Sequence, residues 1–128
     1  MANEMKPTPA ELADFCVACA EEKLAENTAK LHVGPVSSVA DYFVIATAGS
    51  EPQLRAIVGF IEREAREKLR LRPLSESGES ASGWVLLDFG TVIVHVMTPE
   101  VRDRYNLEGL WSESPSQEAV LTLAEKHP

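Results

Sequence analysis

The stretch WVLLDFGTVIVHVM, residues 84–97, constrains the fold more than any other part of the chain. It is a nearly continuous apolar run interrupted by DFG, a turn signal, so it predicts two strands joined by a tight hairpin. Side chains alternate between the two faces of a strand, and a two-residue loop would pair positions whose numbers sum to an odd value. A three-residue loop would exchange the faces, so the assignment depends on the loop length.

With a two-residue loop, one face of the hairpin is apolar throughout, as a face beneath a helix must be. This face comprises Val85, Leu87, Phe89, Val92, Val94 and Val96. The opposite face, called the mixed face below, comprises Trp84, Leu86, Asp88, Ile93, His95 and Met97. A tryptophan among aliphatic side chains and a few polar groups is typical of a protein interface. A second helix over this face, with His95 as a satisfied core histidine, fits the same residues equally well.

Three helix starts are visible. Thr8, with Pro9 and Glu11, makes a capping box and predicts a helix to about Asn27. Ser50 and Gln53 make a second capping box before the apolar stripe of residues 49–71. Thr98 precedes a proline and predicts a third helix. Residues 106–111 suggest a further short turn or helix.

Strands are expected at residues 30–33 and 41–48, with a weaker candidate at 72–77 and a Ser/Gly/Glu loop at 76–83. The resulting order α, β, β, α, β, β, β, α predicts the α/β class, with a mixed sheet and helices packed against it. A chain of 128 residues fits one domain. We assign residues 1–111 to this domain and residues 112–128 to a C-terminal extension, either a helix or a mobile tail.

Charge narrows the choice of partner. Twelve basic and twenty acidic residues give a formal charge of −8, which opposes broad contact with nucleic acid. A basic protein is therefore a more plausible binding partner than nucleic acid. No apolar stretch approaches the ~20 residues that span a bilayer, and the N-terminus lacks the apolar core of a signal peptide, so a cytoplasmic protein is expected.

The sequence contains no strong indication of a catalytic site. Asp88 and His95 could orient each other, but no nucleophile motif accompanies them. Cys16 and Cys19 form a C-x-x-C inside a helical pattern and among acidic residues, which favours buried cysteines over a redox or zinc site. The ATAGS turn before the second helix could hold phosphate on its backbone amides, although a plain helix cap is the stronger reading. We expect no catalytic residues, no metal and no cofactor.

The segments SVADYFVIATAGSEPQLRAIVGFIE and GWVLLDFGTVIVHVMTPEVRDRYNLEGLW resemble the ribosome silencing factors, RsfS, of the Iojap family. The resemblance spans about residues 10–111. Its most specific parts are the W-V-x-x-D-x-G-x-x-x-V-H-V run and the Y-x-L-E-x-L-W motif that follows it.

The resemblance implies a fold similar to the nucleotidyltransferase core without known enzymatic activity. It also implies binding to the large ribosomal subunit through ribosomal protein L-fourteen, which blocks joining of the small subunit and represses translation when nutrients are scarce. A homodimer is a further implication. We expect docking through the mixed face extended by Tyr105 and Leu107, with Trp84 in an apolar pocket and Asp88 facing a basic side chain. The alternative is a nucleotide-binding or nucleotidyltransferase-like enzyme that uses the Gly49–Ser50 turn.

Overall fold

The computed structural model describes residues 6–35 and 40–105. Within them the elements follow the predicted order. They are α1 (Pro9–Glu22), β1 (Glu26–His32), β2 (Tyr42–Thr47), α2 (Glu51–Glu64), a π-helical turn η2 (Ala65–Leu69), β3 (Ser75–Glu79), a 3-10 turn η3 (Ser80–Ser82), β4 (Trp84–Asp88), β5 (Val92–Met97) and α3 (Pro99–Tyr105). The segments 106–111 and 112–128, for which a short helix and an extension were predicted, lie outside the described residues.

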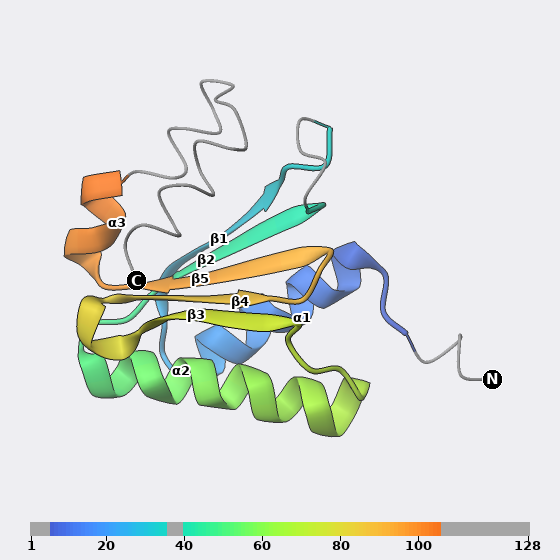
Figure 1. Ribbon diagram of the computed structural model, residues 1–128, viewed down its shortest axis with the longest axis horizontal. Coiled ribbons are helices and arrows are strands. Elements are labelled where there is room, and N and C mark those ends of the chain that lie inside the picture. The colour runs from blue at the N-terminus through green and yellow to red at the C-terminus, as the bar shows by residue number, and fades with distance from the viewer. Residues whose placement is uncertain (1–5, 36–39, 106–128) are drawn as a thin grey trace.

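The strands form one mixed sheet in the order β1-β2-β5-β4-β3. Strands β2 and β5 pair in parallel, and the other neighbouring strands of this sheet pair antiparallel. Helices α1 and α2 lie on one face of the sheet, while α3 lies at one end on the opposite side (Figure 1). The α/β class with a mixed sheet and packed helices is confirmed.

The β4–β5 hairpin has the two-residue loop on which the sequence analysis depended. Trp84 pairs with Met97, Asp88 pairs with Ile93, and the Phe89 amide donates to the Val92 carbonyl at 2.9 Å. Residues 90 and 91 form the loop. The glycine at position 90 has φ +91°, a conformation that glycine adopts without steric cost. The faces are therefore assigned as predicted.

Helix α1 begins as predicted but ends earlier. The Glu11 amide donates to Thr8 Oγ1 at 3.1 Å and the Thr8 amide donates to Glu11 Oε1 at 2.8 Å, so the capping box is complete. The predicted end near Asn27 is wrong, because Leu24 and Asn27 adopt positive φ angles of 65° and 50° that a right-handed helix excludes. Strand β1 consequently starts at residue 26, ahead of the predicted start at residue 30.

Helix α2 is capped by Ser50, whose Oγ accepts from the Gln53 amide at 3.2 Å. In the predicted capping box the Gln53 side chain would accept from the Ser50 amide. Gln53 Oε1 instead accepts from the Gly49 amide at 2.7 Å. The helix continues into η2 and ends at Arg70, which has φ +57°. Strand β3 covers residues 75–79, part of which was predicted to be loop. Its exposed, polar side chains suit a sheet edge, where apolar alternation is not required.

The main core lies between the sheet and the two long helices. It contains the uniformly apolar hairpin face, with Val85, Leu87 and Val94 among its buried members, and Phe89 packs against it. Leu54, Ile57 and Ile61 supply the buried stripe of α2. This confirms the predicted core face and orients the mixed face away from α1 and α2. In the described residues, no helix is both long and apolar enough to cross a membrane.

Candidate partner-binding face

The mixed face forms one side of the central sheet. Its residues join two side chains of β2, Phe43 and Ile45, which alternate in phase with β5. Val33, Ala40 and Val101 pack onto the same cluster from the segment after β1, the segment before β2 and helix α3. These five residues were not predicted to lie on this side of the sheet. The alternation of residues 42–47 was the signal that could have placed Phe43 and Ile45.

The mixed face is more deeply buried than expected. Trp84 is 1% exposed, and Leu86, Ile93, His95 and Met97 are also buried. These side chains pack into a second core cluster, so Trp84 is not exposed in this structure. Their contact with a partner stays a prediction.

His95 has an unusual environment for a histidine. Its Nδ1 accepts a hydrogen bond from Trp84 Nε1 at 3.1 Å, and its ring lies 4.9 Å from the Phe43 ring between centroids. The neutral imidazole therefore carries its proton on Nε2. This buried Nε2 has no hydrogen-bond partner among the residues that the structure describes. Desolvation on burial lowers the pKa of His95 from 6.5 to about 3, so the ring is neutral at physiological pH.

Asp88 lies at the rim of the mixed face and is only half-buried. Its Oδ1 accepts from the Gly90 amide at 2.7 Å, so the carboxylate also braces the hairpin turn. Tyr105 is the last residue of α3. Leu107 lies outside the described residues.

Trp84 Nε1 donates to His95 Nδ1, and the Gly90 amide donates to Asp88 Oδ1. Neither of these two hydrogen bonds joins Asp88 to His95. A general base needs an orienting partner and a reachable substrate, and His95 is fully buried. The geometry therefore gives no support to an acid/base pair at this site.

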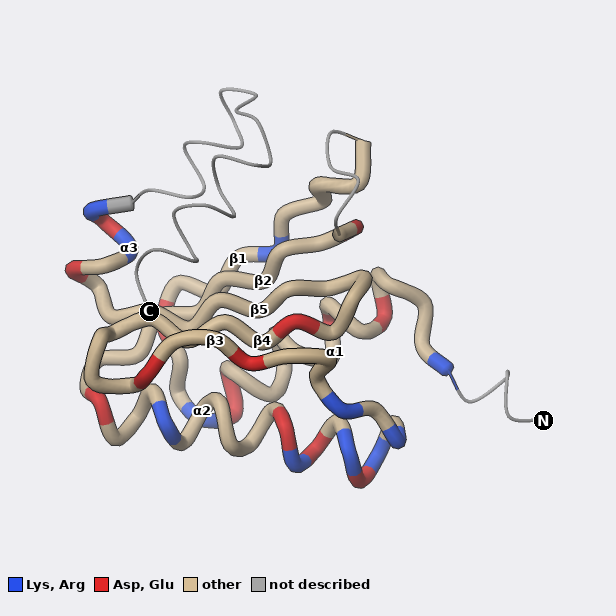
Figure 2. The backbone as a smooth tube through the Cα atoms, in the orientation of Figure 1, with Lys and Arg blue, Asp and Glu red and all other residues tan. Residues whose placement is uncertain are grey.

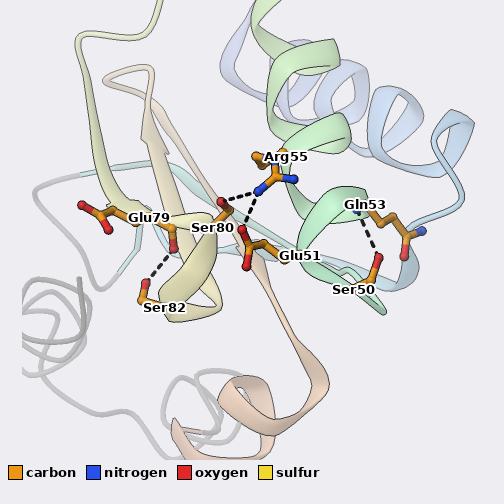
Figure 3. A network of polar contacts seen from close by, with 7 residues as sticks. All are labelled: Ser50, Glu51, Gln53, Arg55, Glu79, Ser80 and Ser82. Atoms are coloured by element: carbon orange, nitrogen blue, oxygen red, sulfur yellow. Dashed lines mark hydrogen bonds and ion pairs between the residues drawn. The ribbon is translucent and has the colours of Figure 1, made fainter.

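The Gly49–Ser50 turn is engaged in capping and in tertiary contacts. Gln53 accepts from the Gly49 amide and donates through Nε2 to the Lys23 and Leu24 carbonyls at 3.3 and 2.9 Å. Figure 3 shows Arg55 near the start of α2 reaching both Glu51 and Ser80. The Gly49 and Gln53 amides already have acceptors, so these two donors are not free to bind phosphate as amides at a helix N-terminus can.

Cys16 and Cys19 are both buried on α1. Burial raises the pKa of the Cys16 thiol to about 12. Burial, together with the charges of Glu64 and Glu22, raises the pKa of the Cys19 thiol to about 11. These thiols are poor nucleophiles. Within residues 6–35 and 40–105, no three His, Cys, Asp or Glu side chains gather as a metal site would require.

The profile of a family described as "Ribosomal silencing factor during starvation" matches residues 6–127. The chain belongs to this family. The match includes most of the segment 112–128 that the sequence analysis treated as an extension.

Relatives of the ribosomal silencing factor family cover most of the chain. A ribosomal silencing factor from Halalkalibacterium halodurans is 36% identical over 84% of this chain and 92% of its own length. A mouse protein called "Mitochondrial assembly of ribosomal large subunit protein 1" is 33% identical over 88% of this chain, which spans about half (52%) of that longer protein. A crystal structure of a protein from Chromobacterium violaceum has a TM-score of 0.78 at 27% identity, covering 83% of this chain and 88% of that one.

Proposed function

We propose that this protein is a non-enzymatic ribosomal silencing factor. It binds the large ribosomal subunit through ribosomal protein L-fourteen, blocks association of the small subunit and represses translation under nutrient limitation. The observation that carries the proposal is the family match over residues 6–127. The name of the mouse relative, which refers to the large ribosomal subunit, supports the choice of subunit.

The net charge supports a basic protein partner. A chain of formal charge −8 is attracted to a basic ribosomal protein, and complementary charge accelerates encounter. The site of contact that we propose is the mixed face, extended by Tyr105 and Leu107. Because most of the mixed face is buried, the first contacts fall on its rim, where Asp88 meets a basic side chain. The buried residues hold the rim in shape.

The decisive experiment is sedimentation of the protein with isolated large subunits and with intact ribosomes. The proposal expects the protein to co-migrate with large subunits and not with intact ribosomes, and it expects added protein to reduce subunit joining. Equal binding to both particles, or normal joining at saturating protein, would contradict it.

The proposed site is tested by two variants of Asp88 against purified L-fourteen. Asp88→Lys should weaken binding at least about tenfold, because it opposes a basic partner with like charge. Asp88→Asn is the matched control, since its amide oxygen can still accept from the Gly90 amide. An intermediate loss for Asn would assign the effect to charge. Unchanged affinity in Asp88→Lys would remove this residue from the interface.

The enzyme alternative has a direct test. Calorimetry with ATP and magnesium should give no binding heat, because the Gly49 and Gln53 amides at the start of α2 are occupied by capping contacts. A saturable heat that disappears in Ser50→Ala would favour the alternative.

A further inference from the structure

A basic groove lies on α2, which is on the opposite side of the sheet from the mixed face. Its volume is ≈ 540 Å³. The residues that line it are Lys23, Arg55, Ala56, Gly59, Phe60, Glu62, Arg63 and Arg66. Four of the twelve Lys and Arg residues of this acidic chain therefore meet in one place. Figure 2 shows basic positions along α2, on the helix layer beneath the sheet.

Two of the cations are held against one aromatic ring. Lys23 Nζ lies 4.7 Å from the centroid of the Phe60 ring, and the guanidinium carbon of Arg63 lies 5.3 Å from it. Neither Lys23 nor Arg63 forms an ion pair with another described residue. A cation on an aromatic face keeps its hydrogen-bond donors available to a ligand.

The other two cations, Arg55 and Arg66, each form an ion pair with a nearby carboxylate, and the two pairs differ in length. Arg55 pairs with Glu51 one helical turn away. Arg66 lies 3.8 Å from a Glu67 oxygen, a long contact between side chains that are about half exposed. Exposed pairs of this kind are worth ~0–1 kcal/mol and exchange readily for a stronger anion.

Among the described residues, Glu62 is the carboxylate that lines the groove. Burial raises its pKa, the charge of Glu76 on β3 and a hydrogen bond with that side chain also raise it, and the charge of Arg66 lowers it. The hydrogen bond with Glu76 ties Glu62 to β3. Four cations against one carboxylate leave the lining of the groove with an excess of positive charge.

Gly59 leaves the centre of the groove open. A Cβ built at this position would meet no atom within 4 Å, so packing inside the fold does not require a glycine here. A glycine in a helix interior is normally unfavourable. Its absence of side chain lets a ligand approach the helix backbone between Arg55 and Arg63. At a rise of about 1.5 Å per residue, these two arginines stand about 12 Å apart along one helical stripe.

We infer that this groove binds the phosphate backbone of ribosomal RNA when the protein is seated on the large subunit. The inference rests on the proposed function, which places the protein on a particle rich in RNA. Arginine forks match phosphate oxygens, and a stripe of separated cations follows a backbone. The contact is local, which is compatible with a net charge that opposes broad binding to nucleic acid.

The test compares Arg63→Glu with Lys6→Glu, because both reverse one exposed basic residue and only the first lies in the groove. Affinity is measured for large subunits and for isolated L-fourteen over a range of salt concentrations. Arg63→Glu should lower subunit affinity at least about tenfold and reduce the salt slope by about one, while leaving L-fourteen binding within twofold. Lys6→Glu should change neither.

Two results would overturn the inference. Unchanged subunit affinity in Arg63→Glu would show that the groove is not used. An equal loss against isolated L-fourteen would show that it contacts protein.

Protein-free large-subunit RNA at low salt provides an independent arm. Wild-type binding that Arg63→Glu weakens supports the groove even if the wild type fails to bind subunits, a failure that would count against the proposed function. Equal RNA binding by both proteins would count against the groove.

Discussion

The two faces of the central sheet are built by the same alternation and differ in what they bury. The face toward α1 and α2 is aliphatic along the hairpin, with Leu87 and Val94 fully buried. The mixed face buries Trp84 and His95 just as deeply and leaves one imidazole N–H without a partner among the described residues. Strand alternation therefore fixes which side chains share a face. It does not fix whether a face with polar members is exposed.

Truncation of the mixed-face tryptophan is expected to have the largest effect on stability. Trp84→Ala should lower the free energy of unfolding by about 3–5 kcal/mol, because it removes a buried aromatic ring and the donor to His95 Nδ1. Leu87→Ala on the aliphatic face is the matched comparison, with an expected loss of about 2–5 kcal/mol. Denaturant unfolding measures both. A loss below about 1 kcal/mol for Trp84→Ala, with a normal loss for Leu87→Ala, would show that the mixed face is open in solution.

The reactivity of the two cysteines tests whether reagents can reach the core beneath the helix-covered face of the sheet. Because the pKa of each thiol is raised to about 12 or 11, the thiolate fraction near pH 8 is reduced on the order of 100-fold or more relative to a free cysteine. Reaction of the native protein with a thiol reagent should be slowed at least that much. Ala18→Cys places an exposed thiol on the same helix as a control for reagent access. Rapid native reaction of Cys16 or Cys19 would show that this face opens readily.

The pH dependence of stability distinguishes the faces through His95. Its folded pKa is about 3, below the ordinary 6.5, so the unfolded chain binds a proton that the native protein does not. The contribution of His95 to the free energy of unfolding is therefore fully present above pH 6.5 and falls as the pH decreases toward 3. From pH 7 to pH 5 the contribution should fall by about 2 kcal/mol.

His95→Leu should remove that part of the pH dependence. Comparing the unfolding free energies of wild type and variant at pH 7 and pH 5 checks the prediction. Parallel pH profiles for the two proteins would mean that His95 is accessible to protons in the native state.

Gly59→Ala should have the smallest effect, a gain of up to about 1 kcal/mol. Alanine is the better helix residue, and the added Cβ meets no neighbour on the outer side of the helix that covers the aliphatic face. A thermal unfolding scan measures the gain. A lower melting temperature would show that the space over Gly59 is filled in the free protein.

Much of the fold was predictable from local signals. The Thr8 capping box, the Thr98–Pro99 helix start and the tight hairpin at residues 84–97 each depend on residues adjacent in sequence, and each is confirmed. Strand β3 was predicted only in part, because SESGE carries no apolar alternation and becomes a strand through pairing with β4. The early end of α1 was missed since Leu24 is an ordinary helix former.

The candidate site was harder to predict. The membership of the mixed face followed from alternation, whereas its burial depends on residues distant in sequence, such as Val33 and Val101. The basic groove was missed altogether. The net charge of the whole chain does not reveal it, because Lys23 and Arg63 come together only when α1 and α2 are packed against each other.

The position of β5 in the sheet has a consequence for synthesis of the chain. This strand lies at the centre, between β2 and β4, yet it is the last of the five to be translated. Its partner in the parallel pair is about fifty positions upstream, with Tyr42 opposite Val92. The β4–β5 hairpin closes locally, whereas the parallel pairing must close a long loop. The nascent chain therefore cannot complete its sheet until residue 97 has left the exit tunnel, and the edges of β2 and β4 that pair with β5 stay unpaired until then.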